Sequence, residues 1–310
     1  MRAMVFAAGL GARLRPLTEV LPKPVVPVAN RPLAWFSLDY LNRFGVSDVV
    51  LNTHHLASQL RVKLEPHIPD GMRTRFVHES ILLGTGGGLK NAWKPRDGES
   101  FVVVNGDTLF APDLNAALDL HRELDAVATM IVREVPDPES YGSVTVDLSS
   151  KSVSGLLGVP RQSSFVHKKF MFAGLHIFHP RAWRDLPDSG CIIRQTYRSW
   201  VDRGEIIGAF VDNGPWRELG NMKRYIETNC AFASGKINWK GIVRDSLCII
   251  SDSSSVGGET ILENVVIGDN ARIESGVSLK KVVIWEGARV ERDLQNAIVT
   301  GTTLGTVRVE

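Results

Sequence analysis

The chain has 310 residues, of which 44% are hydrophobic and 23% charged, as is ordinary for a soluble globular protein. Its formal net charge of +2 gives no global field, so neither nucleic acid nor a membrane is expected as a partner. The apolar run at residues 3–8 is too short for a signal peptide or a membrane span. Cys191, Cys230 and Cys248 are far apart and odd in number, which argues against disulfides or zinc and predicts a cytoplasmic location.

The first two-thirds of the chain alternates strand-like and helix-like segments. Strands that alternate with helices of about ten residues indicate a Rossmann-like, three-layer α/β domain with a mostly parallel sheet, which we place at residues 1–235. Sites in such sheets gather at the carboxyl ends of the strands. The expected strands are residues 4–7, 48–52, 73–78, 101–105 and 127–133, and the expected helices are residues 32–44, 55–64, 85–93 and 113–124.

The last third, residues 236–310, contains a repeat. Aliphatic residues recur every six positions, as at Ile267, Ile273 and Leu279. This step predicts a short left-handed β-helix, in which three flat faces make one coil of about 18 residues. An ordinary β-meander is the alternative, but its alternation at period two does not explain steps of six. The aligned segments begin at Ser246, Asn264, Lys281 and Asn296, at intervals of 18, 17 and 15 residues.

So few coils cannot be expected to be stable alone. We therefore expect the β-helix to lean on the preceding domain or on another subunit, which predicts a homo-oligomer formed through the β-helix.

A glycine-rich turn followed by basic residues comes directly after the first apolar segment. Gly9 and Gly11 let the backbone approach an anion and turn its amide groups inward. Arg13 and Arg15 are close enough in sequence to neutralise a triphosphate. Lys23 lies between two prolines, so we expect a stiff, extended backbone from which its ammonium group can reach a phosphate. Taken alone, Gly-x-Gly is more often a plain turn; the basic residues after it favour a phosphate cradle.

Residues 7–33 resemble the signature of the sugar-1-phosphate nucleotidyltransferases. The family pattern is Gly-x-Gly followed by Arg, then Pro-Leu-Thr and Pro-Lys-Pro, which stand here at residues 9–13, 16–18 and 22–24. Ala12 replaces a residue that often carries a hydroxyl. Shorter family motifs follow in order at residues 84–88, 105–107, 172–174 and 216–220, before the hexapeptide repeats.

The resemblance implies an enzyme that transfers a nucleoside monophosphate from a nucleoside triphosphate to a sugar 1-phosphate, with Mg²⁺ as cofactor. It implies that Arg13 and Lys23 are catalytic groups, and that Asp107 binds the metal together with Glu218. Magnesium prefers one or two carboxylates together with phosphate oxygens and water, so this pair suffices. The nucleotide-binding positions implied are Ala8, Gly9, Gly11, Glu79, Gly84 and Thr85, and the sugar-binding positions are Asn105, Gly142 and Gly174.

The choice of base depends on Glu79. A carboxylate accepts hydrogen bonds, and guanine offers adjacent N–H donors, so Glu79 favours GTP; a solvated surface glutamate is the alternative reading. The resulting hypothesis is a mannose-1-phosphate guanylyltransferase-like enzyme that makes GDP-mannose. A UDP- or dTDP-sugar pyrophosphorylase remains the alternative among active enzymes.

Two departures from the family pattern motivate further alternatives. Glu218 stands where most relatives have aspartate, and residues 158–160 read Gly-Val-Pro where many have Glu-Lys-Pro. The missing positive charge could come from Arg161, Lys168 or Lys169. A regulatory or pseudo-enzyme subunit that binds nucleotide sugars without catalysis is therefore kept open. A hexapeptide-repeat acyltransferase is disfavoured, because the repeats are short and contain no obvious catalytic histidine.

Overall fold

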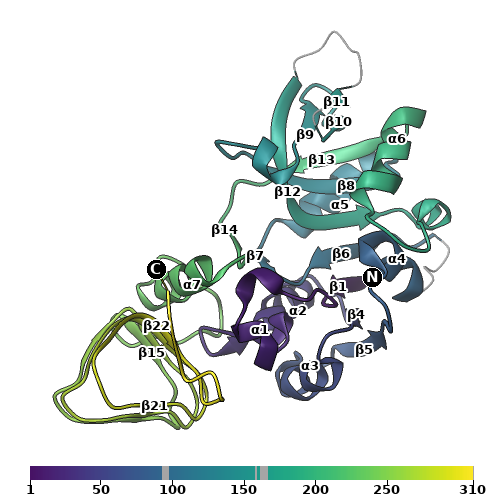
Figure 1. The fold of residues 1–310 in the computed structure, drawn as a ribbon. Coiled ribbons are helices and arrows are strands. Elements are labelled where there is room, and N and C mark those ends of the chain that lie inside the picture. Colours follow the sequence, from purple (N-terminus) through teal and green to yellow (C-terminus); the bar gives the residue numbers. More distant parts are fainter. Residues whose placement is uncertain (93–97, 158, 161–166, 310) are drawn as a thin grey trace. The chain divides into compact units, whose positions relative to one another are not determined.

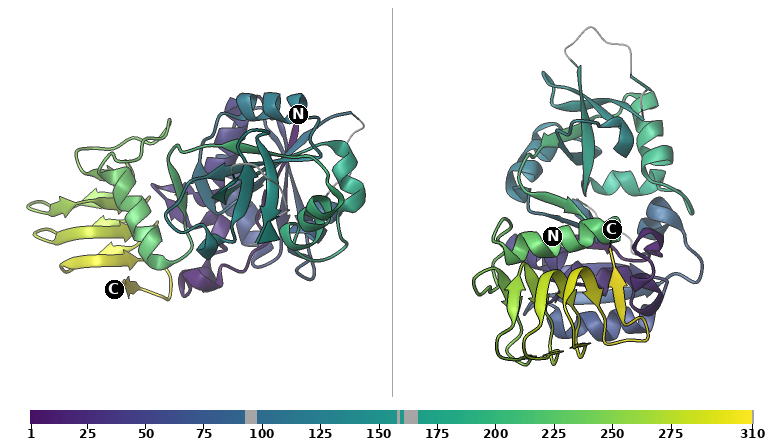
Figure 2. Two further views of the ribbon diagram at one scale, coloured as in Figure 1. Left: turned by 90° about the horizontal axis from the view of Figure 1, so that it is seen from above. Right: turned by 60° about the vertical axis from the view of Figure 1, so that its left-hand side comes forward.

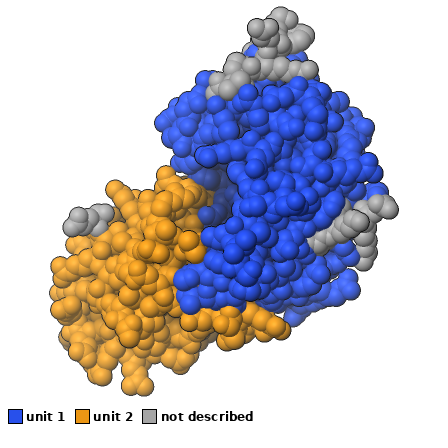
Figure 3. Space-filling view, turned by 45° about the vertical axis from the view of Figure 1, so that its right-hand side comes forward, with its two compact units in different colours: residues 1–9, 36–57, 68–216 blue, residues 10–35, 58–67, 217–310 orange. Residues whose placement is uncertain are grey.

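The computed structural model describes residues 1–92, 98–157, 159–160 and 167–309. They form two compact units, drawn in blue and orange in Figure 3. Among the described residues, no helix is long and apolar enough to cross a membrane. Unit 1 comprises residues 1–9, 36–57 and 68–216, and unit 2 comprises residues 10–35, 58–67 and 217–310.

Unit 1 is built on a ten-stranded sheet (Figure 1). One half is parallel and has the order β6 (Phe101–Asn105), β1 (Arg2–Phe6), β4 (Asp48–Thr53) and β5 (Arg73–His78). The apolar residues at the centre of β1 and β6 are almost completely buried, because the sheet is covered on both faces there. The strands and helices predicted within residues 1–235 are confirmed, with ends shifted by one or two residues. The last residue of one predicted helix, Trp93, lies outside the described residues.

The other half of the sheet differs from the mostly parallel prediction. β12 (His167–Phe178) runs antiparallel between β6 and β8 (Ala128–Arg133), while β13 (Ile207–Val211) is parallel to β8. Some strands that precede β12 in the chain follow one another after only a few residues. Such short connections allow antiparallel neighbours, because a parallel neighbour needs a crossover of about a dozen residues or more. These additional antiparallel strands are β9 (Val144–Asp147), β10 (Ser152–Leu156) and β11 (Val159–Pro160).

Helices pack on this sheet and make it an α/β structure. α4 (Gly84–Ala92) contacts β1 and β4, and α5 (Leu114–Glu123) contacts β8, β12 and β13. Asp113 caps α5, since its Oδ1 accepts a hydrogen bond from Ala116 N at 3.1 Å. The remaining helices and short strands of the chain are α1 (Leu17–Val20), α2 (Leu33–Arg43), α3 (Ala57–Leu64), α6 (Arg198–Arg203), α7 (Met222–Ala233), β2 (Pro27–Val28), β3 (Arg31–Pro32), β7 (Thr108–Phe110) and β14 (Trp216–Glu218).

The C-terminal part of unit 2 is a three-sided stack of short parallel strands (Figure 2). Successive coils are in register along one side, where Cys248 pairs with Val265, and Val266 with Val283. A β-meander would have antiparallel strands, so that alternative is excluded. The strands are β15 (Cys248–Ile250), β16 (Ser255–Val256), β17 (Ile261–Glu263), β18 (Val265–Ile267), β19 (Arg272–Ile273), β20 (Ser278–Ile284), β21 (Arg289–Val290) and β22 (Leu294–Val299), and β23 (Thr306–Arg308) pairs antiparallel with β22.

The repeat in the sequence corresponds to the interior and one corner of this stack. Ile267, Ile273 and Leu279, each six residues from the next, are all nearly completely buried in its core. Asn264 and Asn296 begin their repeats in the left-handed region, with φ of 56° and 48°, a conformation that asparagine tolerates better than most residues.

The core of unit 1 contains a buried histidine among aromatic rings. His176 stacks against Phe178 at 5.2 Å between ring centroids, and its Nδ1 lies 2.7 Å from the Tyr197 hydroxyl. Burial lowers the pKa of His176 to about 3, because a charged imidazole would have no water around it. The folded protein therefore holds this histidine neutral.

This neutral histidine predicts acid sensitivity. An unfolded histidine takes up a proton near pH 6.5, so the stability is complete above that pH and declines as the pH falls towards 3. Between pH 7.5 and 5 the free energy of unfolding should drop by about 2 kcal/mol on account of His176. His176→Gln keeps a polar partner for the Tyr197 hydroxyl. In urea titrations at the two pH values, the free energy of unfolding of this variant should fall by about 2 kcal/mol less than that of the unmodified protein. The exposed His78→Gln is the control, and an equal loss in both variants would contradict the assignment.

Candidate active site

The start of the glycine-rich signature lies at the carboxyl end of β1, in unit 1. Ala7 and Ala8 are buried, and Ala7 N donates a hydrogen bond to Asn52 Oδ1 at 2.8 Å. A Cβ added to Gly9 would meet no atom within 4 Å. The backbone at Gly9 therefore faces open space, where an anion can approach it.

Asn52 links this segment to Glu79. The Asn52 amide donates to Glu79 Oε1 at 2.7 Å, and Leu83 N donates to Glu79 Oε2 at 3.1 Å. Glu79 is only 2% exposed, so it is a buried residue and the alternative of a solvated surface glutamate is wrong. Asn52 was not predicted from the sequence, although a polar residue near the end of a buried strand, at the carboxyl edge of the sheet, is a usable signal.

The glycine run at residues 84–88 allows α4 to lie against a neighbouring loop. A Cβ on Gly87 would come within 2.4 Å of Asp188 O, and one on Gly84 within 2.5 Å of Gly190 O. Thr85 Oγ1 accepts a hydrogen bond from Ile192 N at 3.0 Å. These glycines therefore have a packing role, and the Thr85 hydroxyl is engaged with the backbone of the loop.

Asn105 and Gly174 lie next to each other at the carboxyl end of β6. The antiparallel pairing of Leu175 with Val104 brings them together, and a Cβ on Gly174 would lie 3.4 Å from the Asn105 side chain. Gly174 has φ of 104°, which strongly favours glycine. Asp107 follows two residues after Asn105 and is partly exposed at this edge of the sheet.

Gly142 follows a short helical turn, Glu139–Tyr141, and has φ of 77°. The neighbouring Tyr141 ring, 41% exposed, meets the Trp216 ring edge-on at 6.1 Å between centroids. Arg133 lies over the same indole at 5.6 Å. This aromatic wall with a cation beside Gly142 was not identified from the sequence, because its members come from three distant segments.

The lysines that could replace the missing Glu-Lys-Pro are both paired. Lys168 Nζ is 2.8 Å from Glu134, and Lys169 Nζ is 2.6 Å from Glu139. The hydrogen bond from Lys169 is the largest of the effects that lower the pKa of Glu139. Gly158 and Arg161 lie outside the described residues.

The second part of the signature belongs to unit 2. Gly11 has φ of 63°, and its carbonyl accepts hydrogen bonds from Leu14 N and from the Thr18 hydroxyl. A Cβ on Gly11 would lie 2.8 Å from Thr18 Cγ2 and 3.0 Å from Lys23 Cβ, so this turn requires glycine. It holds Arg13 outward, with a side chain that is 70% exposed.

Lys23 differs from the prediction in its backbone. It was expected on an extended segment, but it begins a 3₁₀ turn, Lys23–Val25, closed by hydrogen bonds from Val25 N to Pro22 O and from Val26 N to Lys23 O. These backbone bonds outweigh the preference that a following proline imposes. The segment is still rigid, and Lys23 is only 9% exposed.

Glu218 lies in unit 2 between two arginines. Its Oε1 is 3.0 Å from Arg13 Nη2 and its Oε2 is 2.5 Å from Arg224 Nη1, and it is 16% exposed. Asn221 caps α7 by accepting a hydrogen bond from Arg224 N at 2.9 Å.

Asp107 and Glu218 have the oxygen ligands that a hard cation prefers, but two carboxylates do not complete its coordination shell. Asp107 belongs to unit 1 and Glu218 to unit 2. Within the described ranges, no group of three His, Cys, Asp or Glu residues could hold a metal ion. Carboxylate oxygens are nevertheless the donors that Mg²⁺ prefers, and substrate phosphates and water commonly complete its shell. The donor chemistry therefore fits magnesium brought in with a nucleotide.

The Asn52–Glu79 tie can be tested by a double-mutant cycle. Asn52→Ala and Glu79→Ala should each lower the free energy of unfolding by at least about 2 kcal/mol, because each leaves buried polar groups unpaired. The double variant should show a coupling of about 1–2 kcal/mol in urea titrations. Glu134→Ala, which removes an exposed carboxylate, should have a small effect that adds to that of Asn52→Ala. Additive losses for Asn52 and Glu79 would show that the tie is not formed.

Comparison with known proteins identifies relatives across most of the chain. The family model described as "Nucleotidyl transferase" matches residues 2–235. The chain is 29% identical over 248 residues to a UTP–glucose-1-phosphate uridylyltransferase of Synechocystis, covering 73% of this chain and 61% of that protein. It is 28% identical over 277 residues to a mannose-1-phosphate guanylyltransferase of Mycobacterium tuberculosis, covering 86% and 76% respectively.

A solved structure gives the same result. HddC from Yersinia pseudotuberculosis, complexed with GMP-PN, is 25% identical and has a TM-score of 0.61, covering 73% of this chain and 97% of that one. The likeness agrees with the α/β fold of unit 1. Because the family model matches well over half of the residues, the chain belongs to the nucleotidyl transferase family.

Proposed function

We propose that this protein transfers a nucleoside monophosphate from a nucleoside triphosphate to a sugar 1-phosphate and releases pyrophosphate. The observation that carries the proposal is the signature turn. Gly11 is packed on Thr18 and Lys23, which fixes the turn, and Arg13 extends from it into solvent. An open backbone at Gly9, an exposed guanidinium and a rigidly held lysine are the groups that a triphosphate requires.

GTP and mannose 1-phosphate are our preferred substrates, with GDP-mannose as product. The mycobacterial relative is named for this reaction, and the HddC structure was solved with GMP-PN. A uridylyltransferase is the second candidate. The cyanobacterial relative favours this candidate. Glu79 also favours it, because recognition of guanine by this residue needs carboxylate oxygens that can accept hydrogen bonds from the base, and both oxygens already accept hydrogen bonds from Asn52 and Leu83.

In the proposed reaction a phosphate oxygen of the sugar 1-phosphate attacks the α-phosphorus in line, and pyrophosphate leaves. A phosphate nucleophile needs no strong base, so positioning and charge neutralisation supply the catalysis. Arg13 and Lys23 neutralise the phosphates, and the backbone around Ala8, Gly9 and Gly11 orients them. Gly84 and Thr85 shape the loop next to the base, and we propose that Glu79 acts mainly by positioning that loop.

Asn105, Gly142 and Gly174 are proposed to line the sugar pocket. The glycines leave room at the sheet edge, and Asn105 presents an amide beside Gly174. Mg²⁺, when bound, would neutralise charge on the phosphates, and Asp107 and Glu218 are the carboxylates that would hold it. Glu218 also orients Arg13 through their ion pair.

Pyrophosphate release tests this proposal. Lys23→Ala should lower turnover by about 10²–10³-fold, the usual effect of removing one electrostatic contact to the transition state. Lys280→Ala, which removes a lysine paired with Glu263 on the stack, should have no effect. The assay pairs GTP, UTP and dTTP with mannose 1-phosphate and glucose 1-phosphate, with and without Mg²⁺.

Near-normal pyrophosphate release by Lys23→Ala would refute the role of this lysine. If the unmodified protein bound GDP-mannose but released no pyrophosphate from any pair, the non-catalytic regulatory subunit would be the better description.

We infer that residues 1–235 form the catalytic domain and that residues 236–310 form a left-handed β-helix. The family model ends at residue 235, and the stacked parallel strands support the β-helix. Leu247, Val256 and Ile261 remain exposed on the stack, with Ile261 67% exposed. We propose that the protein is a homo-oligomer formed through the β-helix, because so short a stack is not expected to be stable alone, and Ile261 is the most exposed of these side chains.

Ile261→Glu tests the oligomer. A charge at an apolar interface should shift the protein towards monomers in sedimentation velocity at micromolar concentration. Glu259→Gln, near the same edge, is the control. A monomeric unmodified protein, or an oligomer that Ile261→Glu leaves intact, would contradict an interface at this side chain.

A further inference from the structure

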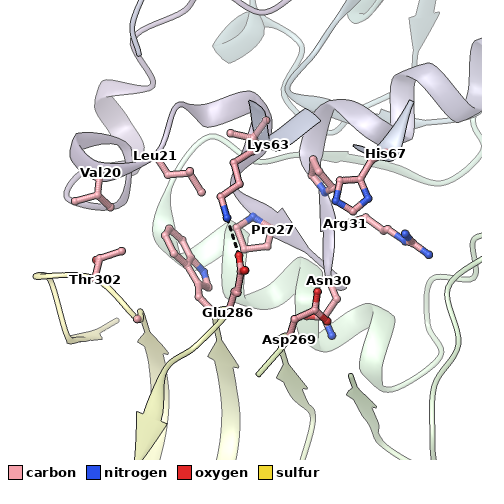
Figure 4. A pocket seen from close by; sticks show the side chains of 15 residues that line it. Val20, Leu21, Pro27, Asn30, Arg31, Lys63, His67, Asp269, Glu286 and Thr302 are labelled. Atoms are coloured by element: carbon pink, nitrogen blue, oxygen red, sulfur yellow. Dashed lines mark hydrogen bonds and ion pairs between the residues drawn. The ribbon is translucent and has the colours of Figure 1, made fainter. Parts of the chain in front are cut away.

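Unit 2 contains a pocket that the proposed reaction does not use. Its volume is about 310 Å³ (Figure 4). Its walls come from the segment after the signature turn, from α3 and the turn that follows it, and from corners of the strand stack. The lining residues include Val25, Arg31, Lys63, Trp285 and Glu286.

One end of the pocket is largely apolar. Val20 and Leu21 lie there, with Thr302 opposite them (Figure 4). Trp285 adds an indole wall, and its Nε1 donates to the Tyr225 hydroxyl at 3.0 Å. Because that hydrogen bond holds the ring, the apolar wall is formed before any ligand arrives.

The other end is basic. Arg31 and His67 lie there (Figure 4), and in the described part of the chain neither side chain has a hydrogen-bond partner. The Arg31 guanidinium only rests over the Trp35 ring at 5.4 Å. Burial, followed by the charge of Arg31, lowers the pKa of His67; the Asp269 carboxylate opposes this shift, and Lys63 adds to it. An anion at this end would therefore find unused hydrogen-bond donors on Arg31 and His67, with the carboxylate of Asp269 as the acidic group nearby.

A single ion pair separates the two ends. Lys63 Nζ lies 2.7 Å from Glu286 Oε2, and the two side chains are 50% and 59% exposed. An exposed pair of this kind contributes little to stability, so a ligand anion can replace Glu286 as the partner of Lys63. The nearby Asp269 carboxylate accepts a hydrogen bond from the Ser251 hydroxyl. Glu286 is thus the acidic group whose removal frees the Lys63 ammonium group for an anion.

We propose that this pocket binds a phosphorylated small molecule. Its phosphate takes Lys63, Arg31 and His67 as partners, and its ring or hydrocarbon part lies at the apolar end. The volume is at the lower limit of ligand pockets, which suits a sugar phosphate or a nucleoside monophosphate. Both kinds of ligand carry a phosphate group, and only the nucleoside monophosphate carries a planar base.

Occupancy of the pocket affects the signature segment. Val25 lines the pocket and belongs to the same 3₁₀ turn as Lys23. A ligand that moves or rigidifies this turn changes the position of the lysine. The site is therefore an effector site for nucleotidyl transfer, and this consequence rests on the proposed function, whereas binding itself does not.

Binding is measured by isothermal titration calorimetry with ribose 5-phosphate and AMP, and with ribose and adenosine as the phosphate-free counterparts. Lys63→Gln should weaken the phosphorylated probes by about tenfold, through loss of one charge-assisted hydrogen bond. Glu286→Gln should tighten them, because it frees Lys63 and removes a negative charge. Lys280→Gln, from the similar exposed pair with Glu263, is the control and should not change affinity.

The two sources of phosphate give different results. Equal binding of both phosphorylated probes indicates a sugar-phosphate site, whereas tighter binding of AMP indicates that a base occupies the apolar end; either supports the proposal. Phosphate-independent binding, equal affinity in Lys63→Gln, or weaker binding in Glu286→Gln would overturn it. Pyrophosphate release measured with the same probes reports regulation separately. A protein that releases no pyrophosphate would refute the proposed function and leave the calorimetric result valid.

Discussion

Two hydrogen bonds of the Tyr225 hydroxyl group join the main parts of unit 2. The hydroxyl group is completely buried, donates to Pro27 O at 2.5 Å and accepts from Trp285 Nε1 at 3.0 Å, so one atom joins α7, the signature segment and the strand stack. Burial raises the pKa of Tyr225, which keeps the proton that the bond to Pro27 requires. Asn229, one turn later on α7, adds a second tie by accepting a hydrogen bond from Ala29 N. The position of the signature segment is therefore set by α7.

This arrangement gives one short segment two roles. Residues 10–32 carry Gly11, Arg13 and Lys23, which we assign to the triphosphate, and the same stretch supplies a wall of the pocket beside Trp285. A chain segment held by buried hydrogen bonds at one end transmits a displacement better than a loose loop does, because packed elements move as bodies. The stack provides the second wall of the proposed effector pocket, and the turn at Lys23 adjoins that pocket through Val25.

In unit 1, too, buried hydrogen bonds join separate segments, here at the edge of the sheet. Asn52 joins Ala7 N to Glu79, so the end of β1 and the loop before α4 are fixed by a single buried amide and carboxylate. The sequence presented Glu79 as a residue that reads a base. The structure shows a carboxylate whose two oxygens already accept internal hydrogen bonds, so under the proposed function Glu79 acts on the nucleotide through the loop that it holds. The glycines at residues 84–88 also help to fix this region, because they permit close packing against residues 187–190.

The sequence by itself determined most helices of the chain, the parallel strands of unit 1 and the kind of chemistry that we propose for the site. Apolar periodicity gave the strands and helices of unit 1, the step of six gave the buried residues of the stack, and the order of glycines, Arg13 and Lys23 indicated phosphate chemistry, because these signals are local. Only the tertiary structure decided the antiparallel insertion of β12, the 3₁₀ turn at Lys23, the pairing of Glu218 with two arginines and the joining of Lys63 to Glu286. Each of these depends on contacts between residues far apart in the chain, and neither periodicity nor motif spacing carries information about such contacts.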